Sequence, residues 1–402
     1  MHLDSGQEKV LRGEAGEAKQ LAMEILTNVG DAMAADSLVP IVSGHVLAHF
    51  SSLHEAGIEM LEKFASAGGK FAVPTTVDPA SVDLENWRSF GIPEDYAEKQ
   101  FRLCRAYGKL GGIPCWTCVQ YQVCNFPKTG EIVAWSESSS VVFANTLIGC
   151  RTNKITSGLD LACALTGLTP RFGMLLDENR RARMSFRVGA GKLSDLDYRS
   201  VGFFLGKTSG ARVPVLNGLP QNITSDEVKH LGAAAAAAGP ITMIHLPGIT
   251  PGSSTEEDAS GGEALERVEI QRSDLDSVEA ELDQTTERPD LVAFGVPHLS
   301  VSEMGDLAKR LSGRKLIDGV KMYIYTSTQA FDMASRSGIK GGIEASGARL
   351  THTTDAEISP LKRMGFNVVM TNSAKLAELV SSEGEIKIRY APTEKIIEEV
   401  TR

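Results

Sequence analysis

The sequence lacks any run of 18 or more apolar residues, so no segment could cross a bilayer as a helix. The opening residues, Met1–Glu8, have neither the basic nor the apolar region of a secretory signal and are too acidic for a transit peptide. Cysteine is scarce: all six cysteines lie between Cys104 and Cys163, unlike those of a secreted disulfide scaffold. We therefore expect a cytoplasmic protein with reduced thiols and no membrane contact.

Basic residues are also in deficit, with 41 Lys and Arg against 51 Asp and Glu and a net charge of -10. Nucleic acid is bound by basic surfaces, so we expect no nucleic-acid partner. The 402 residues, 42% hydrophobic and 23% charged, have the composition of a globular protein. This length predicts one body, residues 1–402, built of two to three interleaved lobes.

Short apolar runs, each followed by a small polar loop or a helical stretch, recur along the chain. They are residues 38–42, 70–74, 291–295, 320–325 and 367–370. This pattern predicts an α/β fold with mostly parallel strands and crossover helices. Ligands bind beyond the carboxyl ends of such strands, so Ser and Thr in these loops are either site residues or helix N-caps.

Three other segments have a distinctive composition. Residues 7–35 have helical spacing, and the alanine-rich stretch 232–239 predicts a helix that packs closely. The polar, acidic stretch 252–262 predicts an exposed loop and a candidate boundary between lobes.

The spacing of Cys115 and Cys118 allows both thiolates to reach one metal ion. No second pair follows, which argues against a zinc ribbon, and the alternative is a pair of buried inert thiols. Glu137 could be a general acid or base, or could satisfy the N–H groups of a helix. Arg151, with Thr152 and Asn153, could bind a carboxylate or phosphate.

Several motifs together resemble the large, catalytic subunit of the aconitase X family. The likeness is strongest in Glu137–Ser139, Phe143–Asn145 and Gly149–Asn153. It extends over nearly the whole chain in short pieces, which include Gly13–Gly16, Pro74–Thr76, Thr117–Cys118, His245–Pro251, Gly295–Ser300 and Thr371–Lys375.

The resemblance implies an aconitase-like, multi-lobed α/β body and a hydro-lyase that dehydrates a small hydroxy acid. Phosphomevalonate and cis-3-hydroxyproline are substrates within the family. It also implies an iron–sulfur cluster on three cysteines and a smaller swivelling domain. This chain has no room for that domain, so a separate small subunit is the implied partner.

Dehydration needs a base beside a carboxylate and an acid that helps hydroxide to leave, and imidazoles carry protons near neutral pH. The expected catalytic residues are His45, Cys118, Glu137, Ser138, His298 and Lys375. The expected residues for binding a carboxylate substrate are Thr75, Thr76, Asn145, Arg151, Thr152, Asn153, Ser300 and Ser373. Each histidine, taken alone, could equally be structural.

The chain departs from the family at the cluster ligands. Cys118 matches the first cysteine, but the second is expected within Leu350–Ala356 and the third within Thr393–Glu398, where none occurs. Asp355 or His352 could replace one of the two missing cysteine ligands, but these residues do not account for both losses. A local site of Cys118 with Cys115, Cys124 and Cys150 is an alternative. We therefore expect the cluster to be absent. If a cluster is present, Cys118 is the expected ligand.

Two alternatives to the hydro-lyase stay open at this point. One is a cluster-free lyase or isomerase of specialised metabolism, in which Cys118 acts as a thiol acid, base or nucleophile. The other is a non-catalytic binding subunit of the same fold. Retention of Arg151–Asn153 and Ser373–Lys375 argues against the second, because an inactive body needs no anion site.

Overall fold

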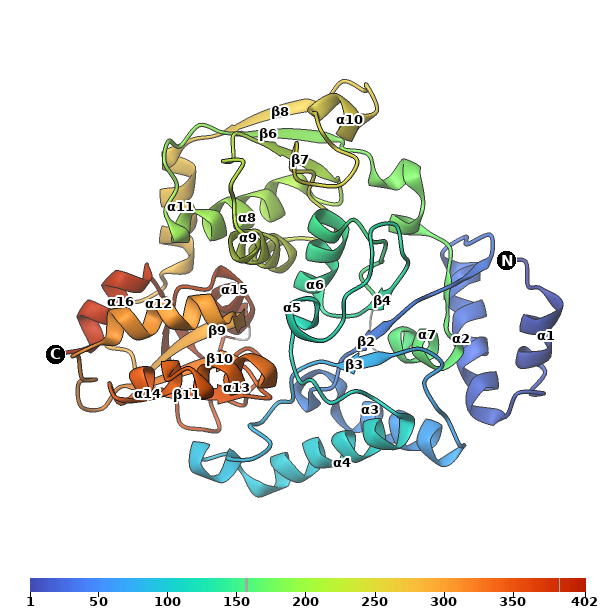
Figure 1. The fold of residues 1–402 in the computed structure, drawn as a ribbon, viewed down its shortest axis with the longest axis horizontal. Helices are drawn as coiled ribbons and strands as arrows, with labels where there is room; N and C mark the ends of the chain where they lie inside the picture. Colours follow the sequence, from blue (N-terminus) through green and yellow to red (C-terminus); the bar gives the residue numbers. More distant parts are fainter. Residues whose placement is uncertain (156–157, 383) are drawn as a thin grey trace.

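Three lobes, each built on its own parallel sheet, follow one another along the chain (Figure 1). The structure, a computed structural model, describes residues 1–155, 158–382 and 384–402. In Figure 1 the first lobe lies on the right, the second at the top and the third on the left. None of the described helices has the length and apolar content needed to cross a bilayer.

The first lobe holds a parallel sheet of order β3-β2-β4 and an antiparallel pair, β1 with β5. The strands are β1 (Leu38–Pro40), β2 (Gly44–Val46), β3 (Thr75–Val77), β4 (Ala134–Trp135) and β5 (Leu168–Pro170). The helices are α1 (Ser5–Leu11), α2 (Glu17–Ala32), α3 (Phe50–Ser66), α4 (Glu94–Leu110), α5 (Gln120–Val123), α6 (Ser138–Phe143) and α7 (Leu159–Thr166). A π-helical turn, Ala144–Ile148, continues α6.

The second lobe holds the parallel sheet β7-β6-β8. Its elements are β6 (Met184–Val188), α8 (Asp195–Ser209), β7 (Pro214–Asn217), α9 (Ser225–Ala238), α10 (Glu256–Ser260), β8 (Glu266–Ile270) and α11 (Arg272–Leu282). The alanine-rich α9 packs closely, as the sequence predicts, because α8 presents Gly202 and Gly206 to it. A Cβ at Gly202 would lie 2.1 Å from the carbonyl oxygen of Leu231.

The third lobe holds a five-stranded parallel sheet of order β11-β10-β9-β12-β13. Its strands are β9 (Leu291–Leu299), β10 (Lys321–Thr326), β11 (Arg349–His352), β12 (Val368–Thr371) and β13 (Lys387–Tyr390). Its helices are α12 (Val301–Leu311), α13 (Thr328–Arg336), α14 (Ile339–Glu344), α15 (Ala374–Ser382) and α16 (Thr393–Val400). The chain order reverses between β9 and β12, which is where ligand crevices form in such sheets.

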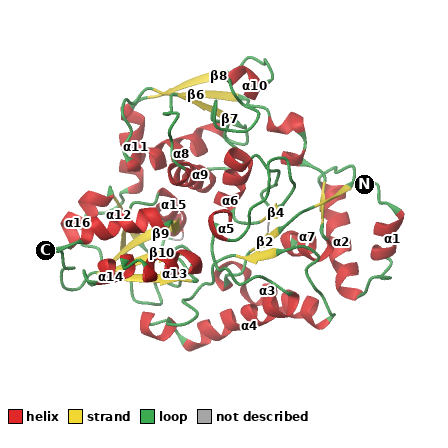
Figure 2. Cartoon of the chain, in the orientation of Figure 1, coloured by secondary structure: helices red, strands yellow, loops and turns green. Residues whose placement is uncertain are grey.

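Central strand β9 is buried along its entire length, because helices cover both faces of the sheet (Figure 2). Gly295 has a φ of 102°, and a Cβ there would lie 2.2 Å from the carbonyl oxygen of Tyr325. Glycine thus permits the close approach of β9 to β10, just before His298.

The largest apolar core extends across the lobe boundaries. It joins first-lobe residues such as Val46 and Leu103 to residues of the third-lobe sheet such as Leu291 and Val369. A second core packs Trp135 and Val141 of the first lobe against the second lobe. The lobes are therefore fixed to one another by shared packing.

The predicted α/β fold with mostly parallel strands is confirmed, and three predicted segments need correction. The strand expected at residues 70–74 is instead Thr75–Val77, and the helix expected over 7–35 is two helices separated at Gly13 and Gly16, both of positive φ. The stretch 252–262 is largely exposed but contains α10, because Thr255 caps that helix together with Asp258.

Candidate active site

A small polar cavity of about 140 Å³ lies where the first and third lobes meet. It is lined by Leu47, His49, Asp78, Pro79, Cys118, Ser136, Glu137, Ser138, Asp355, Glu357, Ile358 and Lys375. A cavity of about 430 Å³ lies between α8, α9 and α12, but its buried Glu303 is already paired with Lys229 and His230. We assign the site to the smaller cavity because its ionisable groups face a shared space.

Strand ends supply most of the polar lining. Asp78 directly follows β3, Glu137 follows β4 and caps α6, and Lys375 lies in the first turn of α15 after β12. The carboxyl ends of parallel strands are therefore where these groups gather, as expected for this class of sheet.

Lys375 is a buried cation between two carboxylates. Its Nζ lies 2.6 Å from Oε1 of Glu137 and 3.0 Å from Oε2 of Glu357. The other oxygen of Glu137 accepts hydrogen bonds from Ser139 Oγ at 2.5 Å and from the main-chain N of Ser140 at 2.6 Å. Burial lowers the pKa of Lys375, but Glu137 and Glu357 outweigh it and hold that pKa well above its ordinary value. Lys375 is therefore a fixed positive charge.

Asp78 connects two histidines at the cavity wall. Nε2 of His45 lies 3.2 Å from its Oδ1, and Nε2 of His49 lies 3.6 Å from its Oδ2. Burial opposes ionisation of Asp78, but both imidazoles outweigh it and lower its pKa to about 2. Burial likewise opposes protonation of His45, but Asp78 raises its pKa.

The hydroxyl of Thr76 contacts His45 directly. Thr76 Oγ1 lies 2.9 Å from Nδ1 of His45 and 3.2 Å from the carbonyl oxygen of Gly44, which also accepts from Nδ2 of Asn125. On the other side of the ring, Nε2 faces Asp78, which raises the pKa of His45 and so favours an imidazolium paired with the Asp78 carboxylate.

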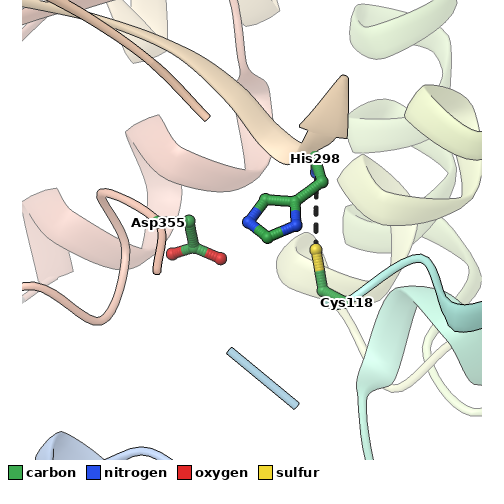
Figure 3. A group of neighbouring side chains, drawn as sticks. All are labelled: Cys118, His298 and Asp355. Atoms are coloured by element: carbon green, nitrogen blue, oxygen red, sulfur yellow. Dashed lines mark hydrogen bonds between the residues drawn. The ribbon is translucent and has the colours of Figure 1, made fainter. Parts of the chain in front are cut away.

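Cys118, His298 and Asp355 form a third buried group (Figure 3). One ligand atom from each lies within 4.8 Å of the others. Burial raises the pKa of Cys118 and of Asp355 well above their ordinary values and lowers that of His298 to about 4. Burial thus favours the neutral form of all three groups, and Lys375 partly opposes this effect for Cys118 and Asp355.

The three-thiolate cluster implied by the resemblance does not fit this donor set. All six cysteines lie in the described part of the chain, and only Cys118 lines the cavity. Cys115 donates to the carbonyl oxygen of Val77 and lies beside Cys124, while Cys150 bonds to the carbonyl oxygen of Ala144. His352 lies elsewhere, against Thr328 and Phe331.

The structure does not bring the Arg151–Asn153 segment into the cavity. Arg151 donates to the carbonyl oxygen of Leu175 and to the carboxylate of Asp177. The other polar groups here are satisfied internally: Asn145 bonds to main-chain oxygens of Thr152 and Thr242, and Asn153 bonds to main-chain groups of Phe172 and Met174. These contacts organise the junction of the first and second lobes, as does the fully buried Thr152.

Four further expected binding residues act as local structural groups. Ser300 caps α12, and Ser373 accepts from the main-chain N of Leu376 at the start of α15. Thr75 donates to the carbonyl oxygen of Val73, and Thr76 orients His45. Of the expected catalytic residues, Cys118, Glu137, Ser138 and Lys375 line the cavity, while His45 and His298 lie directly behind its wall.

His49, Asp78 and Glu357 line the cavity but were not expected from the sequence. The sequence offered one signal for Asp78: it directly follows the Pro74–Val77 stretch, at the end of strand β3. Glu357 had only its position two residues after Asp355 to mark it.

The variant His45→Gln is expected to lose more stability at pH 5 than at pH 9. His45 has a raised pKa, so its contribution is complete below about pH 6.5 and is lost as pH rises through the folded value. Asp78 has a lowered pKa, so its contribution is complete above about pH 4 and is lost toward pH 2. Urea unfolding should give a loss of about 3 kcal/mol at pH 5. An equal loss at both pH values would show that His45 is neutral.

The variant Arg151→Ala is expected to change the free energy of unfolding by less than about 1 kcal/mol, because its Asp177 partner is exposed. We expect turnover to be retained, since Arg151 lies outside the cavity. Steady-state kinetics with thermal unfolding as the folding control would check this. Abolished turnover in a folded variant would instead place an anion site at Arg151.

Three domain models of the aconitase X family match the chain in succession. The first domain matches residues 1–178, the second domain 182–280 and the third domain 289–402. They follow the three lobes without interleaving, and the stretch 252–262 lies inside the second.

Relatives and a solved structure agree with these matches over the full chain. The phosphomevalonate dehydratase large subunit of Methanothermobacter thermautotrophicus is 36% identical over 94% of each chain. The cis-3-hydroxy-L-proline dehydratase of Pseudomonas aeruginosa is 36% identical over 97% of this chain and 68% of its own. The holo-form crystal structure of Thermococcus kodakaraensis aconitase X, 34% identical, superposes with a TM-score of 0.92 over all of both chains. The chain belongs to the aconitase X family.

Proposed function

We propose that this chain is the large subunit of a hydro-lyase that removes water from a small hydroxy acid. The observation that carries the proposal is the buried Lys375 between Glu137 and Glu357, in a chain that aligns end to end with dehydratase subunits. Relatives of equal length are named large subunits. A separate small subunit that completes the site is therefore part of the proposal.

Lys375 is the group that binds the substrate carboxylate. It is positively charged, buried and fixed in place by Glu137 and Glu357. Two of the three N–H donors of Lys375 face Glu137 and Glu357, so the third can donate to a substrate carboxylate, and little water screens that contact. The same charge stabilises the electron density that develops on the carboxylate when the neighbouring carbon loses its proton.

Glu357 is the proposed base and His49 the proposed acid. Burial raises the pKa of Glu357, as suits a carboxylate that accepts a proton near neutral pH. Glu357 takes the proton from the carbon next to the substrate carboxylate, the C–O bond to the hydroxyl breaks, and His49 supplies the proton with which hydroxide leaves as water. Asp78 orients His49, and the proton balance is restored from solvent.

The test is a dehydration assay of the chain produced together with its small subunit. Phosphomevalonate and cis-3-hydroxy-L-proline are offered first, then other hydroxy acids, and water loss is followed by mass spectrometry. Glu357→Gln should lower kcat by about 10²–10⁴-fold, because it removes the base without changing shape. The exposed Lys309→Met is the matched control for a surface change. No water loss from any hydroxy acid, or full activity in Glu357→Gln, would refute the proposal.

A second candidate is an isomerase that shifts a double bond with the same acid and base. The observation in its favour is that Cys118 is the single thiol in the cavity, so the family's cluster chemistry does not carry over directly. Offering unsaturated acids in deuterated water distinguishes the two. Deuterium incorporation without gain or loss of water would identify the isomerase.

A further inference from the structure

We propose that Cys118, His298 and Asp355 form the binding site for a single divalent transition-metal ion, in place of the family's three-thiolate cluster. The ion's chemical role rests on the proposed function, whereas its binding does not. The ions that this site would bind are Zn²⁺ and Fe²⁺.

The donor set has the composition and compactness that such an ion requires. It offers one sulfur, one imidazole nitrogen and one carboxylate oxygen, all within 4.8 Å of one another. Donors that lie about 2.0–2.3 Å from one ion are at most about 4.6 Å apart, so these side chains need only a small shift to share an ion. Sulfur and nitrogen ligands favour zinc and iron over magnesium or calcium. A single thiolate, by contrast, cannot hold a cluster that needs three.

Three different segments bring the donors together. Cys118 precedes α5, His298 lies near the end of β9, and Asp355 follows β11. In Figure 3 the three side chains converge from these segments. The main-chain N of His298 donates to Cys118 Sγ at 3.4 Å, and Asp355 accepts from the main-chain N of Glu357 at 3.0 Å. The fold thus fixes the donors before any ion arrives.

The hydrogen bonds of His298 select the nitrogen that would bind the ion. Nε2 lies 3.0 Å from the carbonyl oxygen of Thr354, which can only accept, so Nε2 carries the hydrogen. The lone pair is therefore on Nδ1, which faces the hydroxyl of Thr117 at 3.0 Å. A metal-bound histidine commonly donates its other N–H to a main-chain carbonyl in this way. Turning the Thr117 hydroxyl away would free Nδ1.

Position and charge also suit a dication. Cys118 and Asp355 both line the cavity, so a bound ion would have an open coordination position toward a substrate oxygen. The carboxyl groups of Asp78, Glu137 and Glu357 line the same cavity beside the proposed ligands. A divalent cation bound there would have acidic neighbours and could act as a Lewis acid.

The experiment is a cobalt titration of the full chain after treatment with a chelator, under argon. We expect one Co²⁺ per chain, with the near-ultraviolet charge-transfer band of a cobalt–thiolate bond, and displacement by Zn²⁺. Cys118→Ser should abolish that band, and Cys118→Ser and Asp355→Asn should each weaken binding by at least about 10-fold. Cys104→Ser, a thiol on α4, and Asp306→Asn, an exposed carboxylate on α12, are matched controls that should keep one ion per chain.

Two results would overturn the inference. The first is acid-labile sulfide with two or more irons per chain in protein purified without oxygen, which would mean a cluster. The second is cobalt binding by the native chain without a thiolate band, a measurement that does not depend on any variant folding. Because binding is measured without turnover, a chain that binds one ion but dehydrates nothing would refute the proposed function alone.

Discussion

Lys375→Met is expected to lower dehydration by about 10²–10³-fold and the free energy of unfolding by about 3–5 kcal/mol. Methionine fills similar space but leaves Glu137 and Glu357 buried without their shared cation. Unpaired buried charges cost more than the pair itself contributes, so the loss comes mainly from the two carboxylates. Turnover falls because the group that binds the substrate carboxylate is gone.

Urea unfolding and steady-state kinetics measure the two effects separately. The double variant Lys375→Met/Glu137→Gln should recover part of the stability but none of the activity, because it removes one unpaired charge without restoring the cation. Lys309→Met, whose side chain is 79% exposed, should change neither quantity. Full activity in the Lys375 variant would assign carboxylate binding to another group.

Lys229→Met is expected to lower the free energy of unfolding by about 3–5 kcal/mol. The groups that line the active-site cavity should be unchanged, because Lys229 is not one of them. Lys229, on α9 of the second lobe, has a fully buried amino group that pairs with Asp226 at 3.0 Å and with Glu303 of α12. It also donates to the carbonyl oxygen of His298 at 3.2 Å. Its removal leaves Glu303 buried beside a single histidine, His230.

The effect should shrink in acid. The pKa of Glu303 is lowered by Lys229 and His230 despite burial, so its contribution is complete above the unfolded value near 4.3 and is lost as pH falls. Urea unfolding at pH 7 and at about pH 3, which lies inside that window, tests this. Proteolysis should also become faster near residues 283–290, between the second and third lobes. An unchanged difference at about pH 3 would mean that Glu303 is not the group affected.

The sequence predicted the architecture better than it predicted the boundaries. The runs at 291–295, 320–325 and 367–370 became β9, β10 and β12, because continuous apolar stretches suit strands covered on both faces. The strand predicted at residues 70–74 begins five residues later in the structure, because the polar Thr75 and Thr76 lie inside it. Their hydroxyls are satisfied by Val73 and Gly44, which a pattern of apolarity does not reveal.

The site was predicted in part. Cys118, Glu137 and Lys375 came from motifs shared with the family, and all three line the cavity. Asp78 and Glu357 were missed because each is one carboxylate among 51 acidic residues, and only the fold brings them to the same cavity. Arg151 was chosen because Arg-Thr-Asn suits an anion, but Leu175 and Asp177 satisfy that guanidinium.

Because the first and third lobes share contacts, the first lobe cannot finish folding until the third lobe has been synthesised. The main-chain N of Leu84 bonds to Oγ1 of Thr353, 269 residues later in the chain. At ribosomal rates of 5–20 residues per second, that partner emerges roughly 15–50 s after Leu84. During this interval the first lobe presents an unfinished face to solvent or to a chaperone. A nascent chain halted before Thr353 therefore exposes the wall of its own future cavity.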